Sequence, residues 1–102
     1  MSDYYILKGK RVYLVKNVLD WAKQFEKPNR IVKQTKLKNG EFVSTVFLGL
    51  DYNFSGKKRR IFETMVFPSR NNFSELDCDR YATWGEAEKG HERMIKKWKQ
   101  MK

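Results

Sequence analysis

A β-hairpin is predicted by residues 31–50, which read IVKQTKLKNGEFVSTVFLGL. Its first strand runs from Ile31 to Leu37 and its second from Phe42 to Leu50, because both runs are rich in residues that favour strands. Between them stands Asn39-Gly40, a pair that readily adopts the positive φ angles of a tight turn. An antiparallel pair of strands is therefore expected here.

The chain after this hairpin is predicted to form a loop, a strand and a second loop. Residues 51–56 carry turn-forming side chains, and residues 61–67 form a β-prone run that Pro68 ends. Residues 69–80 lack periodicity and combine turn formers with three acids. We expect residues 69–80 to form a surface loop.

A second hairpin and a short helix are predicted before residue 31. The runs Tyr4–Leu7 and Val12–Val15 flank a glycine-containing connection of hairpin length. Asn17 can cap a helix over residues 18–27, which must end before Pro28. The apolar residues that recur at helical spacing in this segment are Val18, Trp21, Ala22 and Phe25.

A longer helix is predicted at the end of the chain. Thr83 and Glu86 have the spacing of a capping box, in which each side chain binds a backbone N–H of the first turn. Apolar residues then repeat every three or four positions at Trp84, Ala87, His91, Met94, Ile95, Trp98 and Met101. Acids gather near the predicted start and lysines near the end, which suits the helix dipole.

These elements predict one α+β domain over residues 1–102. We expect an antiparallel β-sheet with two α-helices packed mainly on one face, in the order β-β-α-β-β-β-α. The length of 102 residues leaves room for one core and excludes a two-domain enzyme. A 15% aromatic content supplies enough apolar surface for the chain to fold rather than remain a basic tail.

The charge balance favours an anionic partner. Lys and Arg number 22 against 12 Asp and Glu, which gives a formal net charge of +10. Lys36 and Lys38 fall on one face of the predicted hairpin if Lys33, Thr35 and Leu37 share the other. One face or edge of the sheet is therefore expected to be basic.

The single cysteine and the N-terminal sequence predict a reducing, intracellular setting. Cys78 has no second cysteine with which to form an internal disulfide, and residues 1–5 lack the pattern of a secretory signal. The longest apolar run, residues 43–50, is too short to cross a bilayer. We expect no membrane partner.

The candidate ligand-binding residues are four adjacent cations and a nearby aromatic residue. Lys57, Lys58, Arg59 and Arg60 stand where a loop meets a strand, so they can converge on phosphates while the strand holds them in place. Tyr52 can stack on a base beside them. The simpler interpretation is a solvated strand entrance that discourages edge-to-edge pairing.

Residues with catalytic or metal-binding chemistry are few. His91 is the only histidine and lies on an apolar stripe, so a structural role with satisfied hydrogen bonds is expected. Zinc sites use several Cys and His, and this chain has one of each, so no metal or cofactor is expected. Glu63 can pair with an arginine or with His91, and Asp51 can cap a turn or orient a ligand hydroxyl.

Three blocks of sequence resemble a family of small phage and prophage proteins of unknown function. They are VSTVFLGLDYNF (residues 43–54), FETMVF (residues 62–67) and RYATWGEAEKGH (residues 80–91). The sequence departs from that family's pattern at Tyr52, where a histidine is expected, and at Pro68-Ser69, where two glycines are expected. The resemblance implies a viral protein in the host cytoplasm that binds a host factor or a defence component.

The sequence leaves several functions open. The leading hypothesis is a non-enzymatic counter-defence protein, anti-CRISPR-like or sequestering a nucleotide signal, that engages a nucleic acid, nucleoprotein or nucleotide through its basic residues. One alternative is a host-takeover inhibitor that docks on an acidic host protein. Another is a double-stranded-RNA-binding module, suggested by the α-β-β-β-α order alone, although Glu86 and Glu88 stand where that module needs cations. The last is an enzyme that uses His91, Glu63 or Asp51.

Overall fold

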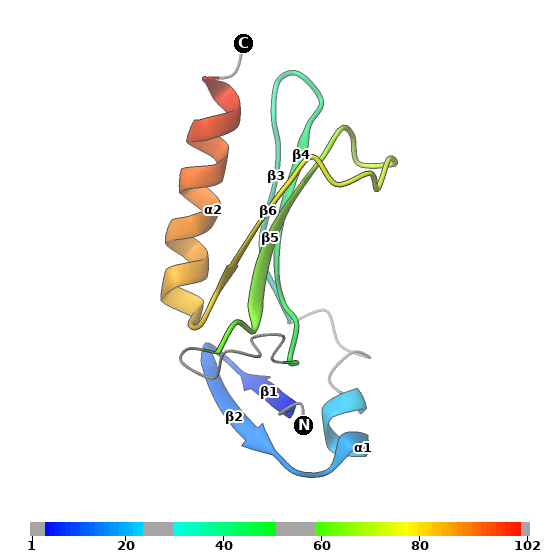
Figure 1. Ribbon diagram of the computed structural model, residues 1–102, viewed down its shortest axis with the longest axis vertical. Helices are drawn as coiled ribbons and strands as arrows, with labels where there is room; N and C mark the ends of the chain where they lie inside the picture. The colour runs from blue at the N-terminus through cyan, green and yellow to red at the C-terminus, as the bar shows by residue number, and fades with distance from the viewer. Residues whose placement is uncertain (1–3, 24–29, 51–58, 101–102) are drawn as a thin grey trace.

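Eight helices and strands make up the described part of the chain, residues 4–23, 30–50 and 59–100 of a computed structural model. Their order is β-β-α-β-β-β-β-α (Figure 1). They are β1 (Tyr4–Lys8), β2 (Arg11–Val15), α1 (Val18–Lys23), β3 (Ile31–Lys36), β4 (Phe42–Phe47), β5 (Phe62–Phe67), β6 (Asp77–Tyr81) and α2 (Trp84–Lys99). The predicted α+β class is confirmed.

The larger sheet has four antiparallel strands in the order β3-β4-β5-β6. The turn at Asn39-Gly40 joins β3 to β4 as predicted, with Gly40 at φ 101° and the Leu37 N–H donating to the Glu41 carbonyl at 2.8 Å. A glycine adopts that positive φ without steric cost. The predicted central hairpin is therefore confirmed.

Strand β6 corrects the sequence prediction, which assigned residues 69–80 to a loop. Its sequence DCDRY has no apolar pattern, yet each of its five residues pairs with a residue of β5 in an antiparallel register. A strand at the edge of a sheet can carry charged side chains, because they remain partly in water. Among the described residues, four strands thus separate the two helices, which differs from the α-β-β-β-α order of a double-stranded-RNA-binding domain.

Helix α2 covers one face of this sheet. Thr83 caps it as predicted, with Oγ1 accepting the Glu86 N–H at 3.1 Å. Its buried residues are Ala87, Gly90, His91 and Met94. Beneath them, Val43 and Val66 join Met94 and Leu37 in one cluster of the core. The predicted stripe is therefore confirmed from Trp84 to Trp98, although Trp84, Ile95 and Trp98 are only half-buried. Its last predicted member, Met101, lies outside the described residues.

Gly90 lets α2 approach the sheet closely. A Cβ atom at this position would lie 2.1 Å from Cζ of the Tyr81 ring, which is shorter than any real contact. Tyr81 is itself buried, in a cluster of the core with Phe47, Phe62 and Ala87. The missing side chain of Gly90 therefore makes room for the Tyr81 ring.

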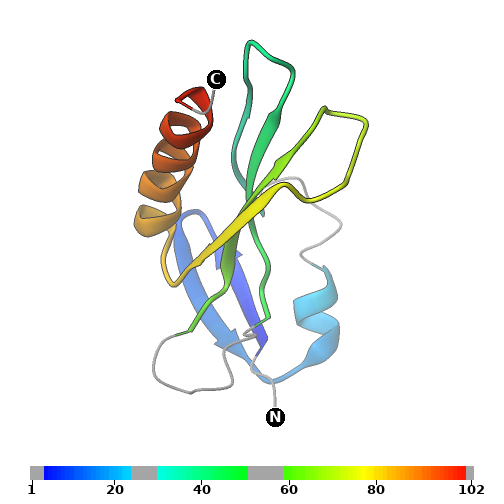
Figure 2. The ribbon, with the colours of Figure 1, turned by 45° about the horizontal axis from the view of Figure 1, so that its top comes forward.

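The remaining elements lie at the other end of the molecule from the C-terminal end of α2 (Figure 1 and Figure 2). Strands β1 and β2 form a separate two-stranded sheet, and α1 packs on them. Tyr5 and Leu7 of β1 complete the core at the end of the large sheet, and the Tyr5 N–H donates to the Gly49 carbonyl at 2.8 Å. We call residues 4–23 the hairpin lobe.

Helix α1 begins as predicted, because Asn17 Oδ1 accepts the Leu19 N–H at 2.8 Å. It is described as far as Lys23, and residues 24–29 of the predicted helix lie outside the described part. None of its residues is buried, and Trp21 meets the Tyr4 ring at 5.1 Å between centroids. Both helices were expected on one face of one sheet. Helix α2 does pack on a face of the large sheet, whereas α1 packs on the separate sheet of β1 and β2.

Within the described residues, no helix is both long enough and apolar enough to cross a membrane.

Candidate functional site

Two of the five predicted ligand-binding residues belong to the described part of the chain. Arg59 and Arg60 precede β5, whereas Lys57, Lys58 and Tyr52 lie outside the described residues. The guanidinium carbon of Arg59 lies 5.3 Å from the centroid of the Tyr5 ring. A cation over an aromatic face is held by the ring's electron density, so Arg59 is positioned by the hairpin lobe.

Arg59 and Arg60 share a small hollow with a third arginine. Its volume is about 130 Å³, and its charged lining residues are Arg59, Arg60, Arg80, Asp79 and Glu86. Three arginines and two acids thus line one hollow at one end of the sheet, beside the start of α2. Guanidinium groups bind phosphate through paired N–H donors, so this hollow has the chemistry of a phosphate contact.

Arg80 is the residue of this hollow that the sequence did not identify. It was assigned to a loop, but it lies in β6 opposite Glu63, with its Nε donating to Glu63 Oε2 at 2.9 Å. Glu63 is buried, which strengthens an ion pair that would be weak in water. The predicted pairing of Glu63 with an arginine is confirmed, and it fixes Arg80 beside Arg59 and Arg60.

His91 has the structural environment that the sequence predicted. Its side chain points from α2 into the core and is fully buried. Its Nδ1 lies 2.6 Å from Thr45 Oγ1, and its Nε2 lies 2.9 Å from Thr35 Oγ1. Thr45 Oγ1 in turn lies 2.5 Å from Thr64 Oγ1. Burial lowers the pKa of His91, because the charged imidazolium would lose its hydration. His91 therefore ties α2 to three strands in its neutral form.

Cys78 is not an activated nucleophile. Its Sγ lies 3.5 Å from Glu63 Oε2, and burial together with that carboxylate raises its pKa to about 12. A thiolate is therefore scarce at neutral pH. Cys78 pairs with Met65 and faces away from Thr64 and His91, because side chains alternate between the faces of a strand. The sheet thus separates the only possible cysteine–histidine pair.

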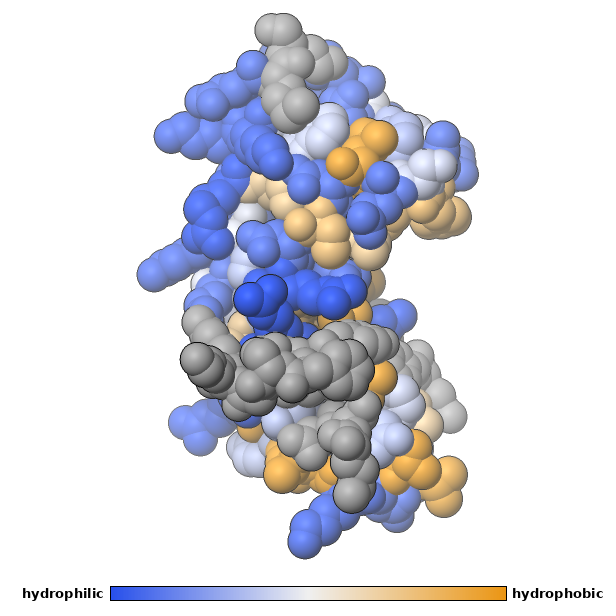
Figure 3. Space-filling model, in the orientation of Figure 1, coloured by the Kyte–Doolittle hydropathy of each residue, from blue (hydrophilic) through white to orange (hydrophobic). Residues whose placement is uncertain are grey.

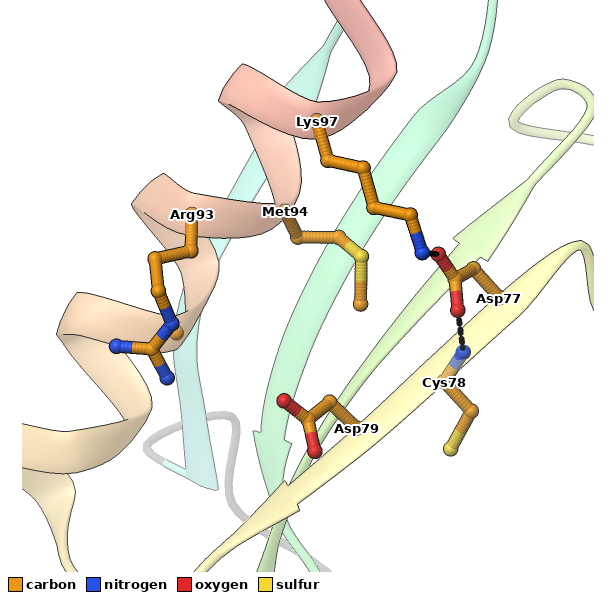
Figure 4. A pocket seen from close by; sticks show the side chains of 7 residues that line it. Asp77, Cys78, Asp79, Arg93, Met94 and Lys97 are labelled. Carbon is orange, nitrogen blue, oxygen red and sulfur yellow. Dashed lines mark hydrogen bonds and ion pairs between the residues drawn. The ribbon is translucent and has the colours of Figure 1, made fainter. Parts of the chain in front are cut away.

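A cleft between α2 and β6 is a second hollow, of about 230 Å³ (Figure 4). Figure 4 shows Lys97 reaching down from α2 to Asp77, whose Oδ2 accepts from Lys97 Nζ at 2.6 Å and from Trp98 Nε1 at 3.0 Å. These bonds lower the pKa of Asp77, with the Lys97 bond contributing most. The ion pair of Lys97 with Asp77 thus holds α2 to the edge strand β6.

Metal-binding groups are not assembled in the described part of the chain. Among residues 4–23, 30–50 and 59–100, no three His, Cys, Asp or Glu side chains come together in a way that could hold an ion. Asp51, the remaining residue of the enzyme hypothesis, lies outside these ranges.

Comparison of the chain with protein families, with curated proteins and with solved structures finds no match in any of the three. The likeness to small phage proteins therefore stays a prediction from the sequence blocks quoted above.

Proposed function

We propose that this protein is a non-enzymatic binder of an anionic, phosphate-bearing partner: a nucleic acid, a nucleoprotein or a nucleotide signal. In an infected host cell it would act in the cytoplasm against a defence system, by occluding or sequestering that partner. The viral setting comes from the sequence resemblance alone. The preference for phosphate comes from the charge of the chain and from the arginine hollow.

The observation that carries the proposal is that Arg59, Arg60 and Arg80 line one hollow. Arg59 is held by the Tyr5 ring and Arg80 by Glu63, so two of the three guanidinium groups are positioned before a ligand arrives. Such preorganisation lowers the entropic cost of binding. The net charge of +10 would attract a polyanion to the molecule.

The environments of His91 and Cys78 support binding rather than catalysis. A general base must reach the proton it removes, and His91 is enclosed by threonine hydroxyls under α2. A nucleophilic cysteine needs a lowered pKa, and that of Cys78 is raised.

Two charge-matched variants test the arginine hollow. Arg59→Ala/Arg60→Ala removes two cations from the hollow, and Lys96→Ala/Lys99→Ala removes two exposed cations from the end of α2. Affinities would be measured for single-stranded and duplex oligonucleotides and a dinucleotide over a range of salt concentrations. We expect the arginine variant to lose affinity and to lower the salt slope for oligonucleotides by about two, one for each lost phosphate contact.

Equal losses in the two variants would show that binding follows total charge, and they would overturn the proposal. Thermal unfolding of each variant establishes that it is folded. This control matters because Arg59 also contacts Tyr5 of the hairpin lobe.

A second candidate function is docking on an acidic protein, and the surface of the hairpin lobe favours it. Leu14 and Leu19 are 58% and 67% exposed, and Tyr13 and Val18 beside them are exposed as well. Figure 3 shows hydrophobic groups at this end of the molecule, bordered by hydrophilic ones. The cations of the lobe are Lys8, Lys10, Arg11, Lys16 and Lys23, against the single acid Asp20. Exposed apolar side chains ringed by cations suit an acidic partner with an apolar centre.

The double variant Leu14→Ser/Leu19→Ser separates the two candidates. If the lobe docks on a protein, this variant loses a partner captured from nuclease-treated cells but keeps its affinity for oligonucleotides. The control is Leu76→Ser, which removes an exposed leucine outside the lobe.

A further inference from the structure

The face of the large sheet opposite α2 is less buried than the face that α2 covers. In β4 the residues under α2, Val43, Thr45 and Phe47, are fully buried, and the alternate residues are only half-buried. In β5, Phe62 and Val66 are fully buried while Met65 and Phe67 are half-buried, and Glu63, which is bonded to Arg80, is the one buried residue of this strand on the opposite face. Helix α2 lies on the face of Thr45, which contacts His91, and α1 packs on β1 and β2. No described helix therefore covers the other face.

Three phenylalanine rings form a connected row on this uncovered face. Phe42 of β4 and Phe67 of β5 are cross-strand neighbours. Phe73, in the loop after β5, meets the Phe67 ring edge-on at 5.8 Å between centroids. Phe73 is 77% exposed, so most of its ring surface faces water. An exposed ring that continues a group of neighbouring aromatic residues is more informative than a single exposed side chain, because contiguous exposed apolar patches mark binding surfaces.

The loop that carries Phe73 has its own internal bonds. The Ser74 N–H donates to Asn72 Oδ1 at 3.0 Å, and the Leu76 N–H donates to the Val66 carbonyl at 2.8 Å. These bonds fix the chain on both sides of Phe73. The exposed ring is thus presented by a structured turn.

Cations stand at the same end of this face as the rings. The guanidinium carbon of Arg70 lies 5.7 Å from the centroid of the Phe42 ring, and Lys36 of β3 is the cross-strand neighbour of Phe42. Lys36, Phe42 and Phe67 therefore form one row across β3, β4 and β5. A polar pair occupies the next row, where Gln34 Nε2 donates to Ser44 Oγ at 3.1 Å.

We propose that this face binds single-stranded nucleic acid, with bases stacked on Phe73 and Phe67 and backbone phosphates against Arg70 and Lys36. The proposal rests on the proposed function in that the ligand is a nucleic acid, but it uses a separate set of residues. The ligand is specified as single-stranded nucleic acid, whereas the arginine hollow suits any phosphate-bearing partner.

The arrangement of rings favours a single strand over a duplex. Bases in a duplex are stacked on each other, so their faces are not available to protein side chains. Unpaired bases can turn outward and stack on aromatic rings, and sheet surfaces that bind single strands present such rings from neighbouring strands. Stacking needs only a π face and is therefore tolerant of sequence.

The charges favour a nucleic acid over an apolar protein segment. Arg70 and Lys36 flank the rings on the side of Phe42, where a strand that stacks on Phe67 and Phe73 would bring its phosphates. Arg80 lies two rows further along the same face, where it is paired with Glu63. Cations beside a stacking surface are typical of single-strand binding.

The experiment uses the full chain and labelled oligothymidylate and oligouridylate of about 12 nucleotides, a length within the usual site size. A duplex of the same length is the comparison. We expect both single strands to bind more tightly than the duplex. Phe73→Ala should weaken single-strand binding at least about fivefold, because one stacked base is lost. Phe73→Tyr keeps the ring and should retain the affinity, and Leu76→Ala is the control in the same loop.

Salt titration separates the two sets of residues. Phe73→Ala should leave the salt slope unchanged, whereas Arg70→Ala should lower it by about one. If the arginine hollow binds oligonucleotides but Phe73→Ala has no effect, the proposed function stands and this inference fails. If Phe73→Ala weakens binding and Arg59→Ala/Arg60→Ala does not, the inference stands and the arginine hollow is wrong.

Two further outcomes overturn the inference. One is a duplex that binds as tightly as the single strands. The other is no oligonucleotide binding at all, together with a protein that is captured from nuclease-treated cells by the wild type and lost with Phe73→Ala. That second result would assign the face to a protein partner.

Discussion

The hairpin lobe and the large sheet with α2 are built in different ways. In the lobe, α1 buries no residue, and only Tyr5 and Leu7 of the strands are buried. In the sheet, β4 and β5 supply fully buried aliphatic and aromatic residues, and a histidine–threonine network lies beneath α2. The sheet therefore holds most of the packing energy, whereas the lobe can change its surface at little cost to folding.

Phe62→Ala is expected to have the largest effect. The Phe62 ring is fully buried against Phe47 at 5.1 Å and Trp84 at 6.2 Å between centroids. Its removal should lower the free energy of unfolding by about 3–5 kcal/mol, through lost burial and the cavity left behind. Urea unfolding measures this change. A loss below about 1 kcal/mol would mean that the core is not held by the sheet.

The second prediction concerns His91 and pH. His91→Gln should lower the free energy of unfolding by about 1–3 kcal/mol, because a threonine hydroxyl loses its buried partner. In the wild type, the pKa of His91 is lowered in the folded state, so the unfolded chain binds a proton more readily. Stability is therefore complete above the unfolded pKa of about 6.5 and falls as the pH drops below it.

The charged neighbours of His91 do not reverse this direction. Glu92 raises the pKa of His91 and Lys33 lowers it, but burial is the largest influence. Asp77 and Glu92 have lowered pKa values, so their contribution is lost only in more acidic solution. The free energy of unfolding of the wild type and of His91→Gln is therefore compared just below pH 6.5, before the carboxylates are protonated. The difference between the two proteins there is the contribution of the histidine. A variant with the same loss of stability near pH 6 as the wild type would show that His91 is not the group that titrates.

The third prediction compares two glycines of α2. Gly90→Ala would force a methyl group against the Tyr81 ring and should destabilise the fold by about 1–3 kcal/mol. Gly85→Ala meets no atom within 4 Å and should stabilise it by about 0.4–1 kcal/mol, because alanine loses less backbone freedom on folding. Thermal unfolding of both variants gives the comparison, and destabilisation of equal size would contradict the close packing of Gly90.

The smallest effects are expected in the hairpin lobe. Asn17→Ala removes the cap of α1 and should cost about 0.5–2 kcal/mol. Leu19→Ala removes an exposed side chain and should change the free energy of unfolding by less than about 0.5 kcal/mol. Hydrogen exchange should show faster opening of α1 in the Asn17 variant while the amides of β4 and β5 keep their protection. Faster exchange throughout the sheet would mean that lobe and sheet unfold together.

The sequence predicted the features that depend on neighbouring residues. The turn at Asn39-Gly40 and the caps at Asn17 and Thr83 follow from local backbone and side-chain chemistry, and all three are present. It failed where a distant partner decides the outcome. Strand β6 forms because β5 offers an edge, and the apolar spacing of α1 did not indicate which surface the helix would meet.

The candidate site was predictable in part for the same reason. The basic run ending in Arg59 and Arg60 is visible in the sequence, but Arg80 joins them only because β6 pairs with β5. The row of Phe42, Phe67 and Phe73 depends on strand register and on the course of a loop. The half-burial of alternate residues in β4, which marks this face, is visible only in the structure.

The hydroxyl groups around His91 have a consequence for where its proton resides. A threonine hydroxyl can both donate and accept a hydrogen bond, and one such group faces each ring nitrogen. The proton can therefore sit on Nδ1 while Thr35 donates to Nε2, or on Nε2 while Thr45 donates to Nδ1, and both tautomers satisfy the same atoms in the same positions. Exchange between them requires the ring to lose a proton at one nitrogen and gain one at the other, with the threonine O–H bonds turning to match. The interior beneath α2 is thus fixed in its heavy atoms but is compatible with two arrangements of its protons, which the nitrogen chemical shifts of His91 would distinguish.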